Sequence, residues 1–167
     1  MSGSPPEAAL DYSNRTRAGR GLNTPAAVLG GLALAGAILA FVATWSPVIK
    51  IQVLSITPWT ATGYDRHSIA LVLLGTFGAI MMFGSLRGAR PAMMALAATG
   101  LVIVLISVLD DLPKLNDTGV WPQATSYEDA QAKAGAGYYL ETLSGALMLV
   151  SGVGFLVLAP TRRRPER

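Results

Sequence analysis

The stretch IALVLLGTFGAIMMFGSLRGARPAMMALAATGLVIVLISVL, from Ile69 to Leu109, decides the fold because it holds two apolar runs separated by four residues. The first run covers 69–86, the second covers 91–109, and the link is Arg87-Gly88-Ala89-Arg90. Each run is long enough to cross a bilayer as a helix, the first only just. So short a link joins two neighbouring helices that run antiparallel to each other. The stretch therefore predicts a transmembrane helical hairpin.

Two further apolar runs lie at 25–45 and 138–159. Thr24 and Pro25 suit the cap and first position of a helix, and Pro160 ends the last run. A cleaved signal peptide is the alternative for the run at 25–45. Its apolar core is longer than the usual ~7–15 residues and no A-x-A site follows it, so we expect a permanent anchor.

These runs predict an all-α membrane protein, a four-transmembrane-helix bundle over residues 25–160. Only 14% of the 167 residues are charged, against about 25% in a soluble domain, and a bilayer explains that deficit. Residues 1–24 are polar and are predicted to form a disordered cytoplasmic tail. Residues 161–167 are predicted to form a basic cytoplasmic tail.

The composition also excludes several classes of chemistry. Cysteine is absent and His67 is the only histidine. Disulfides, iron–sulfur clusters, Cys-ligated zinc, bis-His haem and a multi-His metal site within one chain are thereby excluded. No nucleotide-binding or hydrolase motif appears. The formal charge is only +3 and the basic residues sit in short runs beside apolar stretches, which is typical of membrane topology rather than nucleic-acid binding. We expect no cofactor.

Lysine and arginine predict the orientation of the spans, because they are enriched in cytoplasmic loops. One side of the membrane holds nine basic and three acidic residues and the other holds four and seven, so the sides carry +6 and −3. Both termini are therefore expected inside. Three lysines against ten arginines, with abundant Ala and Gly, suggest a GC-rich bacterium and hence its plasma (inner) membrane.

The two outer segments differ in character. Residues 48–53 alternate with period 2 and are rich in β-branched side chains, which predicts a short strand. Trp59 and Tyr64 suit the membrane interface. Residues 127–134 follow Ser126 in a sequence like a capping box, with Gly135 just after, which predicts a short helix.

Small residues line the predicted spans and favour close helix packing in lipid. The last span repeats a Ser-Gly pair seven residues apart, which places a small-residue stripe on one helix face: Ser144, Gly145, Ser151 and Gly152. The stripe fits packing within the chain. The alternative is a docking face for another membrane-protein subunit or for a second copy of the chain.

Ionisable residues gather where the spans meet the outer surface. In an antiparallel bundle they fall at one depth, and an acid within a span usually faces the interior or water. The cluster is suited to binding a divalent cation or relaying protons; the structural alternative is that Arg66 pairs with Asp110 or Glu141. The candidate functional rim consists of Glu141, Asp110, Asp111, His67, Arg66 and Asp65.

Three short motifs carry a family resemblance: Trp45-Ser-Pro, Gly63-Tyr-Asp and Gly135-Ala-Gly-Tyr-Tyr-Leu. With them, residues 25–160 resemble small four-helix bacterial membrane proteins of the tryptophan-operon-associated type. The resemblance implies the topology above and brings no activity or active site. A claudin-like arrangement, with an outer β-sheet on four helices, is a more distant analogy, against which the absent cysteine pair and the shorter first loop count.

Three functions are compatible with these features. The leading hypothesis is a non-enzymatic accessory or scaffold subunit of a larger envelope complex, because no catalytic motif is present. The second is a small oligomeric protein for proton- or ion-coupled permeation, built around Glu141, Asp110 and His67. The third is a membrane enzyme acting on a lipid or quinone.

Overall fold

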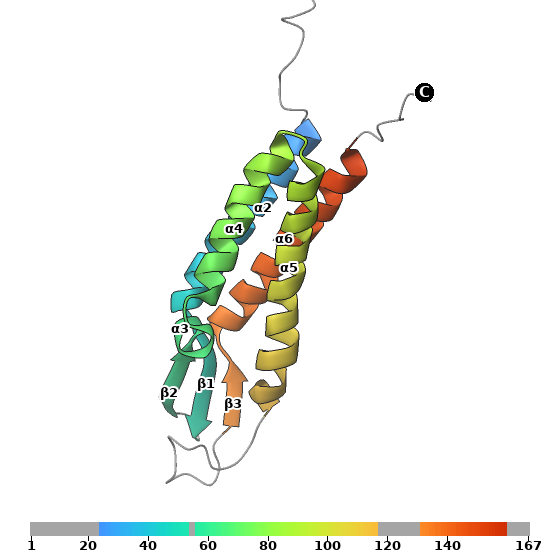
Figure 1. Ribbon diagram of the computed structural model, residues 1–167. Helices are drawn as coiled ribbons and strands as arrows, with labels where there is room; N and C mark the ends of the chain where they lie inside the picture. Colours follow the sequence, from blue (N-terminus) through green and yellow to red (C-terminus); the bar gives the residue numbers. More distant parts are fainter. Residues whose placement is uncertain (1–23, 54–55, 117–130, 160–167) are drawn as a thin grey trace, which may run out of the picture.

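The computed structural model describes residues 24–53, 56–116 and 131–159, and it is mostly helical with one small sheet (Figure 1). Three helices are long and apolar enough to cross a membrane, and a fourth, α4, is apolar but shorter. The helices are α2 (Thr24–Trp45), α3 (Gly63–His67), α4 (Ala70–Leu86), α5 (Arg90–Ile106), the π-helix η1 (Ser107–Asp111), the 3₁₀-helix η2 (Leu112–Asn116) and α6 (Ala136–Leu158).

The helical hairpin predicted from the central stretch is confirmed as a pair of packed helices: α4 and α5 contact each other and are joined by the short link. Gly88 takes a φ of +82°, which glycine adopts without strain. Its N–H donates to Ser85 O, and the N–H of Ala89 donates to Gly84 O, the two bonds of a Schellman motif. Pro91 lies in the first turn of α5, where its missing N–H costs nothing.

Backbone-to-backbone approach at small residues holds the long helices together. A Cβ on Gly100 of α5 would lie 2.6 Å from Gly145 O of α6, and one on Gly145 would lie 2.9 Å from Val104 N. Gly152 likewise lies against Ala97 of α5. The predicted stripe of Ser144, Gly145, Ser151 and Gly152 is buried, and its glycines face α5 of the same chain.

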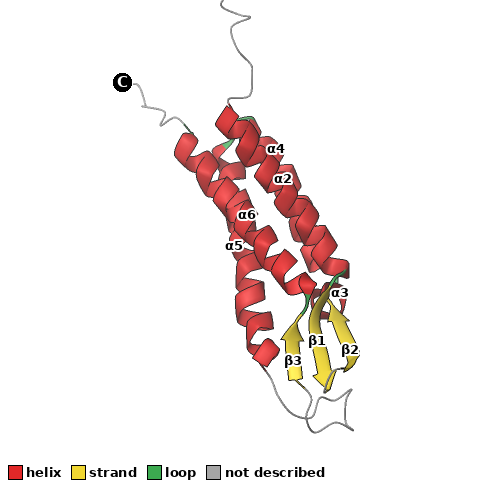
Figure 2. Cartoon of the chain, turned by 180° about the vertical axis from the view of Figure 1, so that it is seen from behind, coloured by secondary structure: helices red, strands yellow, loops and turns green. Residues whose placement is uncertain are grey.

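Apolar side chains fill the space between the helices. One cluster joins α2, α4, α5 and α6, and it includes Ala33, Leu71, Leu96, Ile103 and Met148 at 0% exposure. Figure 2 shows these helices side by side, with the sheet at one end. We call that the sheet end and the opposite one, with the Arg87–Arg90 link, the link end.

The sheet has three antiparallel strands in the order β2-β1-β3. β1 (Pro47–Val53) confirms the strand predicted at 48–53, and it forms a hairpin with β2 (Ile56–Thr62). β3 (Gln131–Ala134) pairs with the other edge of β1, with Ile49 opposite Ala134. A second apolar cluster lies at the sheet and consists of the buried residues Val48, Ile49, Ala61, Leu115 and Ala132.

The prediction of a short helix at 127–134 is wrong for residues 131–134, which form β3. Residues 127–130 lie outside the described residues. The free edge of β1 offers hydrogen bonds and a buried position for Ala132, and such tertiary pairing outweighs local helix signals. Gly135 does not end a helix but precedes α6, where its N–H donates to Val48 O.

The third predicted span, 91–109, lies within one helical segment, Arg90–Leu115, that is long and apolar enough to cross a membrane. The α-helical part ends at Ile106 and the chain continues as η1 and η2. The other predicted bounds, 25–45, 69–86 and 138–159, agree with α2, α4 and α6 to within two residues. The two predicted tails lie outside the described residues, apart from Thr24.

A candidate ionic site at the sheet end

Five of the six predicted rim residues meet at the sheet end. They come from three elements that are distant in sequence: α3, η1 and α6. Asp65 is the exception, because its carboxylate turns back to Thr62. The five that meet are Arg66, His67, Asp110, Asp111 and Glu141.

A capping box fixes the short helix α3 that carries two of these residues. The backbone N–H and the hydroxyl of Thr62 both donate to Asp65 Oδ2 at 2.8 Å, and Asp65 N–H donates back to Thr62 Oγ1. The hydrogen bonds from the Thr62 backbone and hydroxyl lower the pKa of Asp65. Asp65 therefore positions α3, which directs Arg66 and His67 toward the long helices.

The π-helix η1 separates two neighbouring aspartates. Asp111 is 0% exposed and Asp110 is 48% exposed. Arg66 bridges them: its Nη2 donates to Asp110 Oδ2 at 3.0 Å and to Asp111 Oδ1 at 3.2 Å, while its Nε also donates to Asp111 Oδ1. Lys114 Nζ donates to the remaining oxygen of Asp110 at 2.6 Å. Both oxygens of Asp110 are thus held by cations.

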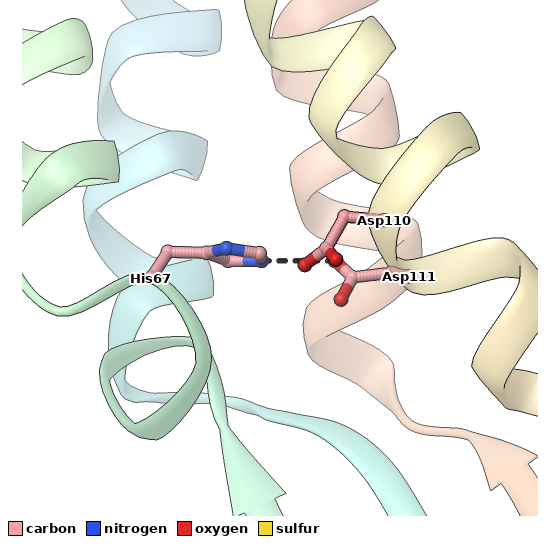
Figure 3. A group of neighbouring side chains, drawn as sticks. All are labelled: His67, Asp110 and Asp111. Carbon is pink, nitrogen blue, oxygen red and sulfur yellow. Dashed lines mark hydrogen bonds and ion pairs between the residues drawn. The ribbon is translucent and has the colours of Figure 1, made fainter.

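His67 connects this pair of aspartates to α6. Its Nε2–H donates to Asp111 Oδ2 at 3.0 Å (Figure 3), and only 8% of its side chain is exposed. The hydrogen bond to Asp111 raises the pKa of His67 above its usual value of 6.5, against the opposing effect of burial. The second acid near the ring is Glu141, whose Oε2 lies 3.7 Å from the same Nε2.

Glu141 is the least satisfied group of the site. It is 0% exposed, and neither carboxylate oxygen has a hydrogen-bond partner within the part of the chain that the structure describes. Ser144, one turn later, has an equally buried hydroxyl without such a partner. Buried carboxylates are nearly always paired, and the exceptions gather at functional sites.

The structural alternative considered for Arg66 holds in part. Arg66 pairs with Asp110 as expected, but its second partner is Asp111, and Glu141 approaches His67 instead. Lys114 is a member that sequence reasoning missed. Its signal was available, because Asp110 and Lys114 stand four residues apart and such a spacing places two side chains on one helical face.

The charges of the site do not balance when every carboxyl group is ionised and His67 is neutral. Asp110, Asp111 and Glu141 then supply three negative charges, and Arg66 and Lys114 supply two positive ones. The ligand atoms of His67, Asp110 and Asp111 lie within 4.8 Å of one another. The arrangement is therefore suited to taking up positive charge, as a proton or as a metal ion.

A comparison of the chain with protein-family models, with curated proteins and with solved structures finds no match. The site is accordingly interpreted from its own geometry.

Proposed function

We propose that the chain crosses the plasma membrane of a bacterium four times, with both termini in the cytoplasm, and acts as a non-enzymatic accessory subunit of a larger envelope complex. In this proposal α2, α4, α5 and α6 form a transmembrane four-helix bundle. The sheet and the ionic site face the outer side of the membrane, and the link end faces the cytoplasm.

Strand pairing supports the four crossings. β1 and β3 belong to one sheet, so the segments before α4 and after α5 lie on the same side of the membrane. If α5 crosses, the Arg87–Arg90 link lies on the other side, and α4 must cross to reach it. α4 has 17 residues, or about 26 Å at 1.5 Å per residue, and a bilayer adapts to a small mismatch of this kind.

The distribution of arginine supports the orientation. Arg87 and Arg90 flank the link, and more arginines precede α2 and follow α6. The start of α2 and the end of α6 lie at the same end of the helices as the link (Figure 1). Cytoplasmic ends of spans carry such residues.

The observation that carries the accessory role is that acidic and histidine side chains are absent from most of the described length of α4 and α6 away from the sheet end. From Thr142 to Leu158 in α6, and throughout α4, there is no Asp, Glu, Lys, Arg or His. The helices instead offer apolar surfaces. One groove of about 300 Å³ lies between α2 and α4, lined among others by Leu34, Ile38 and Phe41, and a groove of this kind accepts side chains of a neighbouring transmembrane helix.

The accessory role is tested by affinity purification of the full chain in mild detergent at native expression, followed by mass spectrometry. Ile38→Trp fills the groove, and Leu101→Trp is the matched control on the exposed face of α5. We expect the same membrane proteins to co-purify with wild type and Leu101→Trp and to be depleted with Ile38→Trp. A chain that purifies alone contradicts the proposal.

Proton or ion permeation is the second candidate, and the buried, unpartnered Glu141 favours it. Because the remainder of α6 offers no further ionisable side chain, permeation requires several copies of the chain and a path along hydroxyl groups and water. Flux into liposomes that contain the wild type is compared with flux for Glu141→Gln. Equal fluxes exclude this function.

A further inference from the structure

The buried carboxylate of Glu141 lies near His67, which cannot donate a hydrogen bond to it. His67 Nε2 carries at most one hydrogen, and Asp111 Oδ2 accepts it at 3.0 Å. The 3.7 Å between His67 Nε2 and Glu141 Oε2 exceeds the length of a hydrogen bond. A single proton on the ring therefore satisfies Asp111 and leaves both oxygens of Glu141 without a donor among the described residues.

A metal ion between these groups can interact with all three of them, whereas the ring proton reaches only Asp111. The ion binds the imidazole nitrogen and both carboxylates at once. We propose that His67 Nε2, Asp111 Oδ2 and Glu141 Oε2 form a binding site for a divalent transition-metal ion, with Zn²⁺ as the best fit. One imidazole with two carboxylates favours Zn²⁺ over Mg²⁺ and Ca²⁺, which take oxygen ligands. This site goes beyond the accessory role and does not depend on it.

The two distances that join His67 Nε2 to the carboxylate oxygens agree with such an ion. Zn²⁺ binds nitrogen and oxygen ligands at about 2.0–2.2 Å, so two ligands of a tetrahedral site lie roughly 3.3–3.5 Å apart. The distances from His67 Nε2 to Asp111 Oδ2 and to Glu141 Oε2 are 3.0 and 3.7 Å, on either side of that value. Glu141 has no hydrogen bond to lose when its side chain adjusts toward a bound ion.

The surrounding cations prepare the site and exclude Asp110 from it. Arg66 binds Asp111 through Oδ1 only, which leaves Oδ2 directed at His67. Outer partners of this kind orient metal-binding carboxylates. The ligand atoms of Asp110 lie within 4.8 Å of those of His67 and Asp111, but Arg66 and Lys114 occupy both oxygens of Asp110.

A bound ion connects three elements that the chain brings together only through folding. His67 follows the β1–β2 hairpin, Asp111 ends the π-helix after α5, and Glu141 lies in the second turn of α6. Coordination would therefore fix the sheet against the ends of α5 and α6. The ion contributes to the stability of the sheet end without a catalytic role.

The test uses the single histidine of the chain. The full chain, purified in mild detergent with a tag free of histidine and treated with a chelator, is labelled with ¹⁵N-histidine, so the protein gives one imidazole signal pair in NMR. We expect Zn²⁺ to shift the Nε2 signal to saturation at one ion per chain. Mg²⁺ and Ca²⁺ at the same concentration should leave it unchanged.

Variants then test the ligand set. Glu141→Gln and Asp111→Asn should each weaken Zn²⁺ binding by roughly 10- to 100-fold or more. Asp110→Asn is the matched control and should change it by no more than a few-fold. The proposal is overturned if the wild-type signal responds to pH but not to Zn²⁺, which means that the site binds a proton only. It is equally overturned if Asp110→Asn abolishes binding while Glu141→Gln does not.

Discussion

The long helices and the sheet end of the molecule are held together by different forces. Between α5 and α6, glycine backbones touch neighbouring backbones, and the side chains around them are apolar. At the sheet end, α3, η1 and α6 meet through Arg66, His67, Asp111 and Glu141. The first region depends on shape and the second on charge, so substitutions that change only one of these properties should separate the two.

The largest effect is expected at the buried aspartate. In metal-free protein, Asp111→Asn removes the charge that faces Arg66 and His67, and should lower the free energy of unfolding by about 3 kcal/mol, as when a buried pair loses one partner. Asp110→Asn is the matched control, because Asp110 is half exposed, and should cost less than about 1 kcal/mol. Reversible unfolding in mixed detergent micelles measures both. Equal costs for the two variants would show that burial does not govern the site.

A smaller loss is expected when the shape of the helix contact changes. A methyl group on Gly100 would meet Leu149 N and lie 2.6 Å from Gly145 O, so Gly100→Ala forces the helices apart. Overpacking of this kind costs about 1–3 kcal/mol. Gly31→Ala is the control, because nothing lies within 4 Å of the added methyl group; it should raise the free energy of unfolding by about 0.5–1 kcal/mol, since alanine is the better helix former. The contact would be looser than described if Gly100→Ala were as stable as the wild type.

The smallest effect is expected from pH and should arise only at the sheet end. Because the pKa of His67 is raised above 6.5 in the folded state, the folded protein holds this proton more tightly than the unfolded chain does. The resulting stabilisation is complete below pH 6.5 and disappears as the pH rises through the folded-state pKa. Metal-free wild type should therefore lose thermal stability across that window, and His67→Gln should lose less. A wild type that gains stability there would contradict the assignment.

The long helices could be predicted from sequence and the sheet end only in part. Apolar runs, Pro91 and the arginines around Gly88 are local signals, and they gave helix bounds that match the structure closely. β3 gives no comparable local signal, because residues 131–134 become a strand only when the edge of β1 is present. A strand formed by tertiary pairing escapes a local prediction.

The ionic site could likewise be predicted only in part. Its residues were identifiable from sequence, because acidic residues in or beside membrane spans are rare and costly. Their pairing could not be predicted, because the sequence gives no signal for the π-helix η1, in which Asp111 is buried while Asp110 is half exposed. The absence of a hydrogen-bond partner for Glu141 likewise appears only once α3 and α6 are placed together.

The most direct test of the central claim, four crossings with the sheet and the ionic site on the outer side, is cysteine labelling. The chain has no cysteine, so Gln131→Cys in β3 and Ala89→Cys in the link each introduce a single exposed thiol. In spheroplasts, a membrane-impermeant maleimide should label Gln131→Cys at once and Ala89→Cys only after the membrane is permeabilised. Labelling of Ala89→Cys in intact spheroplasts, alone or together with Gln131→Cys, would contradict the claim.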